Sequence, residues 1–176
     1  GSGNLNIGTG IGETVGDLSI ATGASQIQGG GIAFIVGASK LQGGSVVIGA
    51  GNSHIETGGS VRMTSGSGGI TGGSFFLESK SMEQTGSSGS IRVASGFANA
   101  GLSGELTIQT GSSGVSRAGD IVLQTGESKI DSSSIVLRAG SSATLTGGAV
   151  DLRSGMSNTV GSSGLISLSS ASAMGS

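Results

Sequence analysis

The sequence predicts an all-β fold, a parallel two-sided β-solenoid (β-helix or β-roll) of about twelve coils. Three observations predict it. An apolar-x-apolar triplet recurs along the whole chain, a small residue and then glycine follow almost every triplet, and the composition disfavours helices. The 176 residues include 38 glycines, and glycine costs about 1 kcal/mol per helical site relative to alanine. Recurrence at a fixed spacing is typical of solenoids.

The triplets are the first element of each copy, and we interpret them as short strands. Their first apolar residues lie 13 to 16 positions apart and are Leu5, Leu18, Ile32, Val46, Val61, Phe75, Ile91, Leu106, Ile121, Ile135, Val150 and Ile166. Their second apolar residues are Ile7, Ile20, Phe34, Ile48, Met63, Leu77, Val93, Ile108, Leu123, Leu137, Leu152 and Leu168. Residues two apart share one face of a strand, so both columns are expected to point inward.

A small or β-branched residue comes two positions after each triplet, and we call these residues the small-residue column. They are Thr9, Thr22, Val36, Ala50, Ser65, Ser79, Ser95, Thr110, Thr125, Ala139, Ser154 and Ser170. Glycine follows in every copy except at Lys80 and Ala171. A recurrent glycine at a strand end predicts a turn with positive φ, so Lys80 is expected to hold a strained left-handed backbone.

The second half of each copy carries one more apolar residue, which predicts a shorter strand between two turns. These residues are Val15, Ile27, Leu41, Ile55, Ile70, Leu102, Val115, Ile130, Leu145 and Val160, with Thr85 in the sixth copy. Stacking such units at about 4.8 Å buries a continuous core that no single unit could bury.

Residues 1–171 are expected to form this one domain, about 55 Å long, and 172–176 a tail that looks like a cloning remnant. An antiparallel meander is less favoured, because such short strands would leave one ragged layer. Disorder is less favoured because only 10% of residues are charged and the mean hydropathy is +0.23.

The Gly/Ser/Thr-rich unit, as in residues 86–96 (GSSGSIRVASG), resembles the short-coil β-solenoid repeats of large microbial cell-surface and adhesive proteins. That resemblance implies an extracellular or cell-surface location and a structural or adhesive role without catalysis. The coil length is also similar to that of grass-type ice-binding β-rolls, which implies ice binding as an alternative. Only Thr144 and Thr146 offer the paired threonines that an ice-binding face would repeat.

Catalytic, cofactor and metal residues are not predicted. His54 is the single histidine and is interpreted as an exposed strand residue, because a triad needs an oriented base and acid beside one particular nucleophile. Glu105 and Asp120 share a column and could hold calcium weakly, but we interpret them as solvated charges near Arg117.

One surface patch is predicted from the outward residues of three successive triplets, Arg62, Phe76 and Arg92. Stacked coils would place the phenylalanine between two guanidinium groups, an arrangement that stabilises an exposed surface or offers a docking spot.

The expected partners are the chain itself, through end-to-end or lateral association, or a surface. A net charge of -2 provides no electrostatic footprint for nucleic acid, and no apolar run approaches a membrane span, so neither nucleic acid nor membrane insertion is expected. Ice is a partner only in the alternative interpretation.

Overall fold

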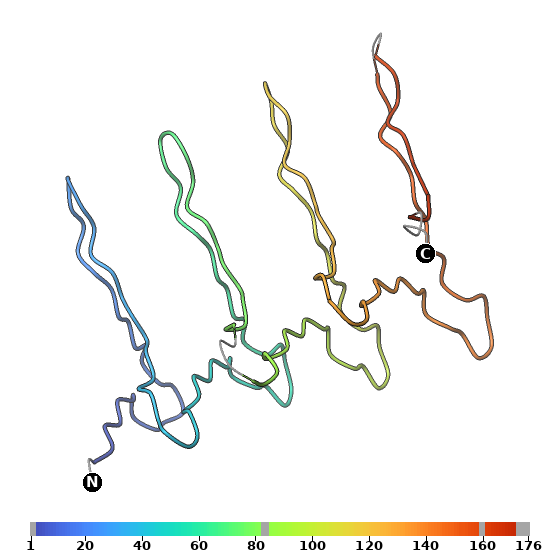
Figure 1. Cartoon of the computed structure of the whole chain (residues 1–176). Helices are drawn as coiled ribbons and strands as arrows, with labels where there is room; N and C mark the ends of the chain where they lie inside the picture. Colours follow the sequence, from blue (N-terminus) through green and yellow to red (C-terminus); the bar gives the residue numbers. More distant parts are fainter. Residues whose placement is uncertain (1–2, 82–84, 159–160, 172–176) are drawn as a thin grey trace. The chain divides into compact units, whose positions relative to one another are not determined.

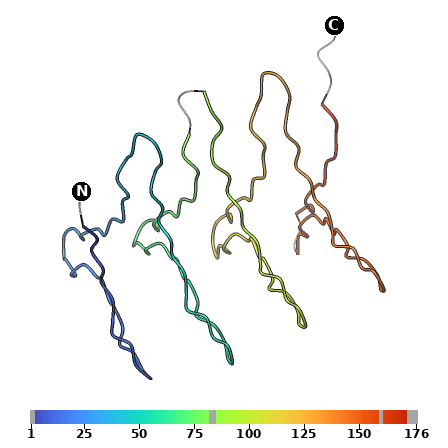
Figure 2. The same ribbon diagram turned by 90° about the horizontal axis from the view of Figure 1, so that it is seen from below.

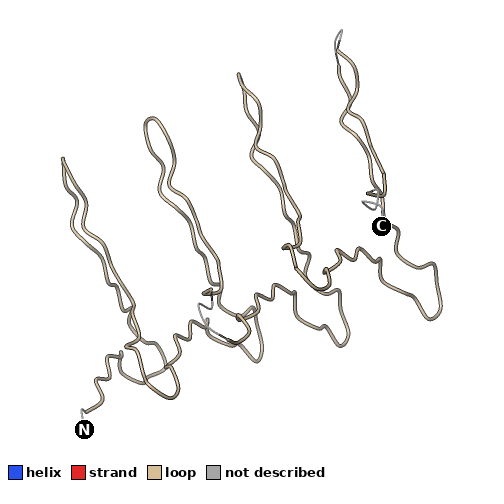
Figure 3. Cartoon of the chain, viewed as in Figure 1, coloured by secondary structure: helices blue, strands red, loops and turns tan. Residues whose placement is uncertain are grey.

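The computed structural model of this chain describes residues 3–81, 85–158 and 161–171, and these contain no helix and no strand. Figure 3 shows the described chain as loop throughout. The chain divides into two units, Gly1–Ile91 and Arg92–Ser176, with the boundary inside the seventh triplet. Each unit is described by itself. A single domain over 1–171 stays a prediction.

The predicted β-solenoid is therefore wrong, as is the resemblance to β-solenoid and β-helix repeats. A parallel ladder needs evenly spaced backbone hydrogen bonds between neighbouring triplets. The described residues instead form four backbone–backbone hydrogen bonds, all between glycines seven to nine positions apart. Folded chains usually contain about one internal hydrogen bond per residue, so these four cannot make a sheet. Successive triplets meet at their ends and are not paired along their length.

The prediction that triplet side chains point into a core is also wrong. No hydrophobic side chain among the described residues is buried. Ile108 and Leu123, whose burial would have supported the solenoid, are 69% and 66% exposed. From the second copy onward the first residue of each triplet is 47–59% exposed, so these side chains are partly covered by neighbouring chain.

In the described residues the second half of a copy forms a bend and not a strand. Seven bends contain the apolar residue of their half-copy, at residues 26–27, 40–41, 54–56, 69–71, 114–116, 129–130 and 143–145. The bends at 12–14 and 99–101 end just before Val15 and Leu102, and the bend at 85–86 contains Thr85. Figures 1 and 2 show the result within each unit: the chain turns back on itself repeatedly, and in the long narrow loops the outgoing and returning segments run close together.

The glycine that follows each triplet does not adopt a left-handed turn. Among the described residues no non-glycine residue has a positive φ, and Gly86 alone among glycines has one, at 157°, close to extended backbone. Lys80 therefore bears no left-handed strain, and that prediction is wrong. In four copies the carbonyl oxygen of the glycine that follows the triplet instead accepts a hydrogen bond from the glycine that precedes the next triplet.

Glycine–glycine hydrogen bonds close several of these loops at their base. Gly59 donates its N–H to the carbonyl oxygen of Gly51 at 2.9 Å, and Gly73 donates to Gly66 at 2.8 Å. In the other unit, Gly148 donates to Gly140 and Gly164 to Gly155, each at 2.9 Å. The acceptor is the glycine that follows a triplet, and the donor is the glycine that precedes the next. The sequence repeat thus recurs as a local closed loop.

In many copies the small-residue column lies against the glycine that precedes the next triplet, which favours small side chains in the column. A Cβ at Gly59 would lie 3.3 Å from the Cβ of Ala50, and a Cβ at Gly148 would lie 3.3 Å from that of Ala139. Comparable approaches join Gly73 with Ser65, Gly89 with Ser79, Gly104 with Ser95, Gly119 with Thr110, and Gly164 with Ser154. Interpreted from sequence as a third inward strand position, the column instead supports the base of each loop.

The sequence-based interpretation also touched residues outside the described ranges. Val160, one of the half-copy apolar residues, and the tail at 172–176 lie there. The predicted end-to-end stacking assumed exposed strand edges at both ends, and the described residues provide no strand to expose.

Candidate interaction surface

The residues that stand out in the described chain are eight apolar side chains in or directly after the bends, which we call the apex residues. They are Ile27, Leu41, Ile55 and Ile70 in the first unit, and Leu102, Val115, Ile130 and Leu145 in the second. All eight are 84–104% exposed, more than the first or second apolar residue of any triplet from the second to the eleventh copy. A recurrent set of exposed aliphatic side chains is a candidate for an interaction surface.

Serine hydroxyls hold six of these bends from within. In the loop around Ile55, Ser53 Oγ accepts the backbone N–H of Ile55 at 3.4 Å and that of Glu56 at 2.8 Å. In the loop around Leu145, Ser142 Oγ accepts the N–H of Leu145 at 2.8 Å. Equivalent bonds are accepted by Ser25, Ser39, Ser113 and Ser128. Such local bonds supply the backbone partners that a ladder would otherwise provide, and they favour a bend over a strand.

Sequence reasoning placed the apex residues in a core and missed them as a surface. A signal in the sequence at five of the eight is the serine two positions before the apolar residue, as in Ser25-Gln26-Ile27, Ser39-Lys40-Leu41 and Ser128-Lys129-Ile130. Serine at that place competes with strand pairing for the backbone N–H groups.

The surface patch predicted at Arg62, Phe76 and Arg92 assumed stacked coils, which the described residues do not form. Phe76 is 81% exposed. Arg62 and Phe76 belong to the first unit and Arg92 begins the second, so the patch stays a prediction.

The charged residues that were considered for metal binding lie in local pairs. Arg117 contacts Asp120 through an ion pair of 2.6 Å, and Glu105 accepts a hydrogen bond of 2.9 Å from the hydroxyl of Thr107. The interpretation of Asp120 as a solvated charge near Arg117 is thereby confirmed. A second exposed ion pair joins Arg153 and Asp151 at 2.6 Å. Across the described ranges, no group of three or more His, Cys, Asp or Glu side chains could hold a metal ion.

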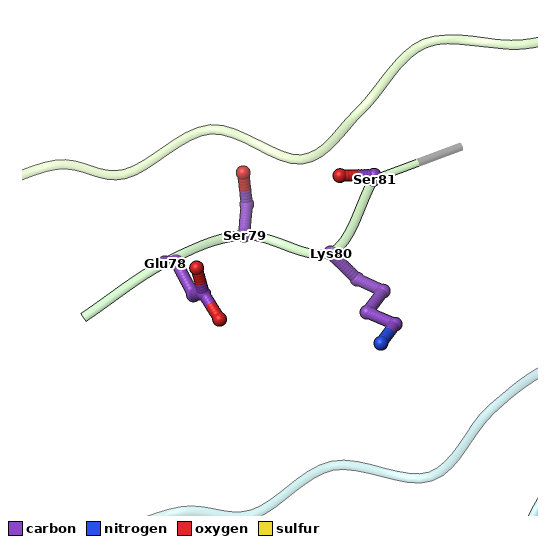
Figure 4. Close-up of a pocket in the computed structure, with 4 residues that line it drawn as sticks. All are labelled: Glu78, Ser79, Lys80 and Ser81. Carbon is purple, nitrogen blue, oxygen red and sulfur yellow. The ribbon is translucent and has the colours of Figure 1, made fainter. Parts of the chain in front are cut away.

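An open hollow of about 410 Å³ lies beside Glu78, Ser79, Lys80 and Ser81, at the copy where lysine replaces the usual glycine. Figure 4 shows the four side chains on one extended segment, with Glu78 and Lys80 pointing to one side and Ser79 to the other. Among the described residues, no second segment brings a polar group to this lining. An active site needs several groups fixed around one reacting atom, and four consecutive residues on one segment do not supply that.

His54 lies in the bend next to Ile55, and not in a strand as interpreted from sequence. It is an exposed residue of a loop that Gly51 and Gly59 close. The exposure predicted for it is confirmed, while its proposed lack of a catalytic role is not tested.

Comparison with protein-family models, with curated proteins and with solved structures finds no match to this chain. Within the part of the chain that the structure describes, no helix has the length and apolar character needed to cross a membrane.

Proposed function

We propose that this chain is a non-catalytic structural or adhesive repeat segment of a larger extracellular or cell-surface protein. The observation that carries the proposal is the recurrence of one local device in both units: a closed or serine-stabilised loop that presents a fully exposed aliphatic side chain. Repeated weak contacts of this kind produce adhesion through multivalency, because each further contact forms at a high effective concentration.

The same features argue against a role that depends on one organised site. Catalysis and metal binding require groups from different segments to converge, and the lining of the hollow at residues 78–81 comes from one segment. The location outside the cell belongs to the proposal because an adhesive segment must meet a surface or another cell to act. Ice binding would need a flat face of regular rows, and with no strand in the described ranges no observation favours it.

The test measures adhesion and location together. Beads coated with the chain are expected to be retained on surfaces that carry the same chain and on apolar surfaces, above beads coated with a Gly/Ser peptide of equal length and charge. An antibody against residues 86–96 is expected to label unpermeabilised cells that produce the parent protein. Retention equal to that of the control beads, or labelling only after permeabilisation, would refute the proposal. Turnover of a substrate by the purified chain would refute its non-catalytic part.

A further inference from the structure

Three closed loops share one topology, in which a single hydrogen bond joins the incoming and the outgoing chain. They span 51–59 and 66–73 in the first unit and 140–148 in the second, and the structure describes all of their residues. Each is closed at its base by one glycine–glycine bond of 2.8–2.9 Å. We propose that these loops are length reserves, which open when the chain is pulled from both sides and close again when the pull ends. Such a role goes beyond the proposed adhesive function and does not depend on it.

The connectivity of the chain places a pull on the closing bond first. The chain enters the first loop at Gly51 and leaves it at Gly59, so the bond between these two residues carries the tension along the chain. The bonds that Ser53 accepts lie inside the closed segment and carry no load until the base opens. The bonds that Ser142 accepts lie inside the loop at 140–148 in the same way.

A loop that opens breaks no hydrophobic core, because no hydrophobic side chain among the described residues is buried. The net stability of an exposed hydrogen bond is small, since water competes for both of its partners. Each loop has its own closing bond within its own unit. We therefore expect the loops to open at low force and independently of one another.

Each loop stores a defined length of backbone. Fully extended chain spans about 3.3–3.6 Å per residue, so the seven or eight residue steps between the bonded glycines reach about 23–29 Å. A bonded pair holds its two Cα atoms about 5.5 Å apart, so opening releases roughly 18–23 Å per loop. A loop of this length closes within about 10–100 ns, so the length is recovered as soon as the tension falls.

The test holds the full chain by its two ends in optical tweezers and measures fluorescence energy transfer across one loop. The sequence has no cysteine, so the dyes are attached at Gly49→Cys and Ser60→Cys, just outside the loop at 51–59. The control pair, Ser103→Cys and Gly114→Cys, has the same separation along the chain. The stretch between the control positions is described throughout and contains neither a bend nor a closing bond.

Energy transfer across the loop is expected to be high at rest, to fall as the force rises and to recover on release, with a change several times larger than across the control pair. Gly59→Ala is expected to raise the ratio of open to closed loops at a fixed force by about two- to tenfold. The reason is that its Cβ would lie 3.2 Å from the nitrogen of Gly51. Gly58→Ala, whose Cβ would make only an ordinary contact of 3.5 Å, should leave the ratio within about twofold of wild type.

The second unit offers the same comparison with dyes at Arg138→Cys and Ala149→Cys. A Cβ at Gly148 would lie 3.3 Å from that of Ala139, whereas a Cβ at Gly147 would lie 3.6 Å from its nearest neighbour. Gly148→Ala should therefore favour the open loop, and Gly147→Ala should not.

A loop pair that responds to force no more than the control pair would overturn the inference, as would equal open fractions in Gly59→Ala and Gly58→Ala. The proposed function fails separately. Loops that open under force in a chain whose beads do not adhere keep the length reserve and lose the adhesive role. Beads that adhere through a chain whose loops do not respond to force keep the adhesive role and lose the length reserve.

Discussion

The substitution Gly59→Ala tests whether the closed loop depends on a bare glycine backbone at its base. A Cβ added there would lie 3.2 Å from the backbone nitrogen of Gly51 and 3.3 Å from the Cβ of Ala50. These distances are tight, so the two segments must separate by a few tenths of an ångström. The 2.9 Å hydrogen bond from Gly59 to Gly51 would then lengthen toward the limit at which such bonds weaken.

The neighbouring substitution Gly58→Ala is the matched control. Its Cβ would lie 3.5 Å from the carbonyl oxygen of Gly51, an ordinary van der Waals contact. Both substitutions remove the same backbone freedom from the open chain, which favours closure by about 0.4–1 kcal/mol in each case. The difference between the two variants therefore isolates the crowding at Gly59.

The net contribution of such a hydrogen bond to the free energy of loop closure is about 0.5–1.5 kcal/mol. This corresponds to a factor of about 2 to 13 in the ratio of closed to open loops. We expect a value near the lower end, because the loop is exposed and water competes for both partners. Amide hydrogen exchange, followed by NMR at residue 59, measures the closed population directly. Protection should fall in Gly59→Ala and be retained in Gly58→Ala. Equal protection in both variants would refute the reasoning that glycine is required for close approach.

Four further outcomes follow from the structure. Ser53→Ala removes the acceptor for the N–H groups of Ile55 and Glu56, so amide exchange at residue 56 should become about two- to tenfold faster. Ser53→Thr keeps the hydroxyl and should retain the protection. Unchanged exchange in Ser53→Ala would contradict the serine-stabilised bend. Gly68→Ala would place its Cβ against the carbonyl oxygen of Thr71, so chemical shifts around Ile70 should move, while Gly69→Ala, which meets nothing nearby, should leave them in place; similar shifts in both variants would count against the described bend. Asp120→Asn removes the exposed ion pair with Arg117 and should leave amide exchange in the neighbouring bend at 114–116 unchanged at physiological salt, because exposed pairs are screened; a clear loss of protection would show that the pair is structural. Far-UV circular dichroism of the full chain should show neither a helix nor a β-sheet spectrum, and a clear sheet spectrum would contradict the strand-free structure of the described ranges.

Local chemistry explains which sequence-based interpretations agree with the structure. The bends stand where short strands were predicted, but their cause is local too: serine or glycine lies near each apex residue, and the partners of the serine bonds lie two or three positions apart. The pairing of Arg117 with Asp120 spans three positions and was likewise predictable. His54 was correctly expected to be exposed, although it lies in a bend.

Pairing between distant segments explains the interpretations that failed. Val46 and Val61 would lie in neighbouring strands only if the backbone N–H groups of one triplet bonded to the carbonyl oxygens of the other. The periodicity of the sequence does not specify which segments pair in this way. Alternating apolar residues are compatible with an inward strand face and equally with the half-exposed segments observed at Ile108 and Leu123. The serine bonds at the bends and the glycine bonds at the loop bases use backbone groups that a parallel ladder would need.

The sequence by itself determined the spacing of the repeat and the small residue that follows each triplet. The contacts of that small residue are local, as between Ala50 and Gly59. Only the structure decided that the second half of most copies bends, that the triplets remain unpaired, and that Ile27, Leu41 and Ile55 lie in solvent. The physical reason is that burial depends on whether another segment of the chain packs against a side chain. The identity of an apolar residue does not determine whether such a segment is present.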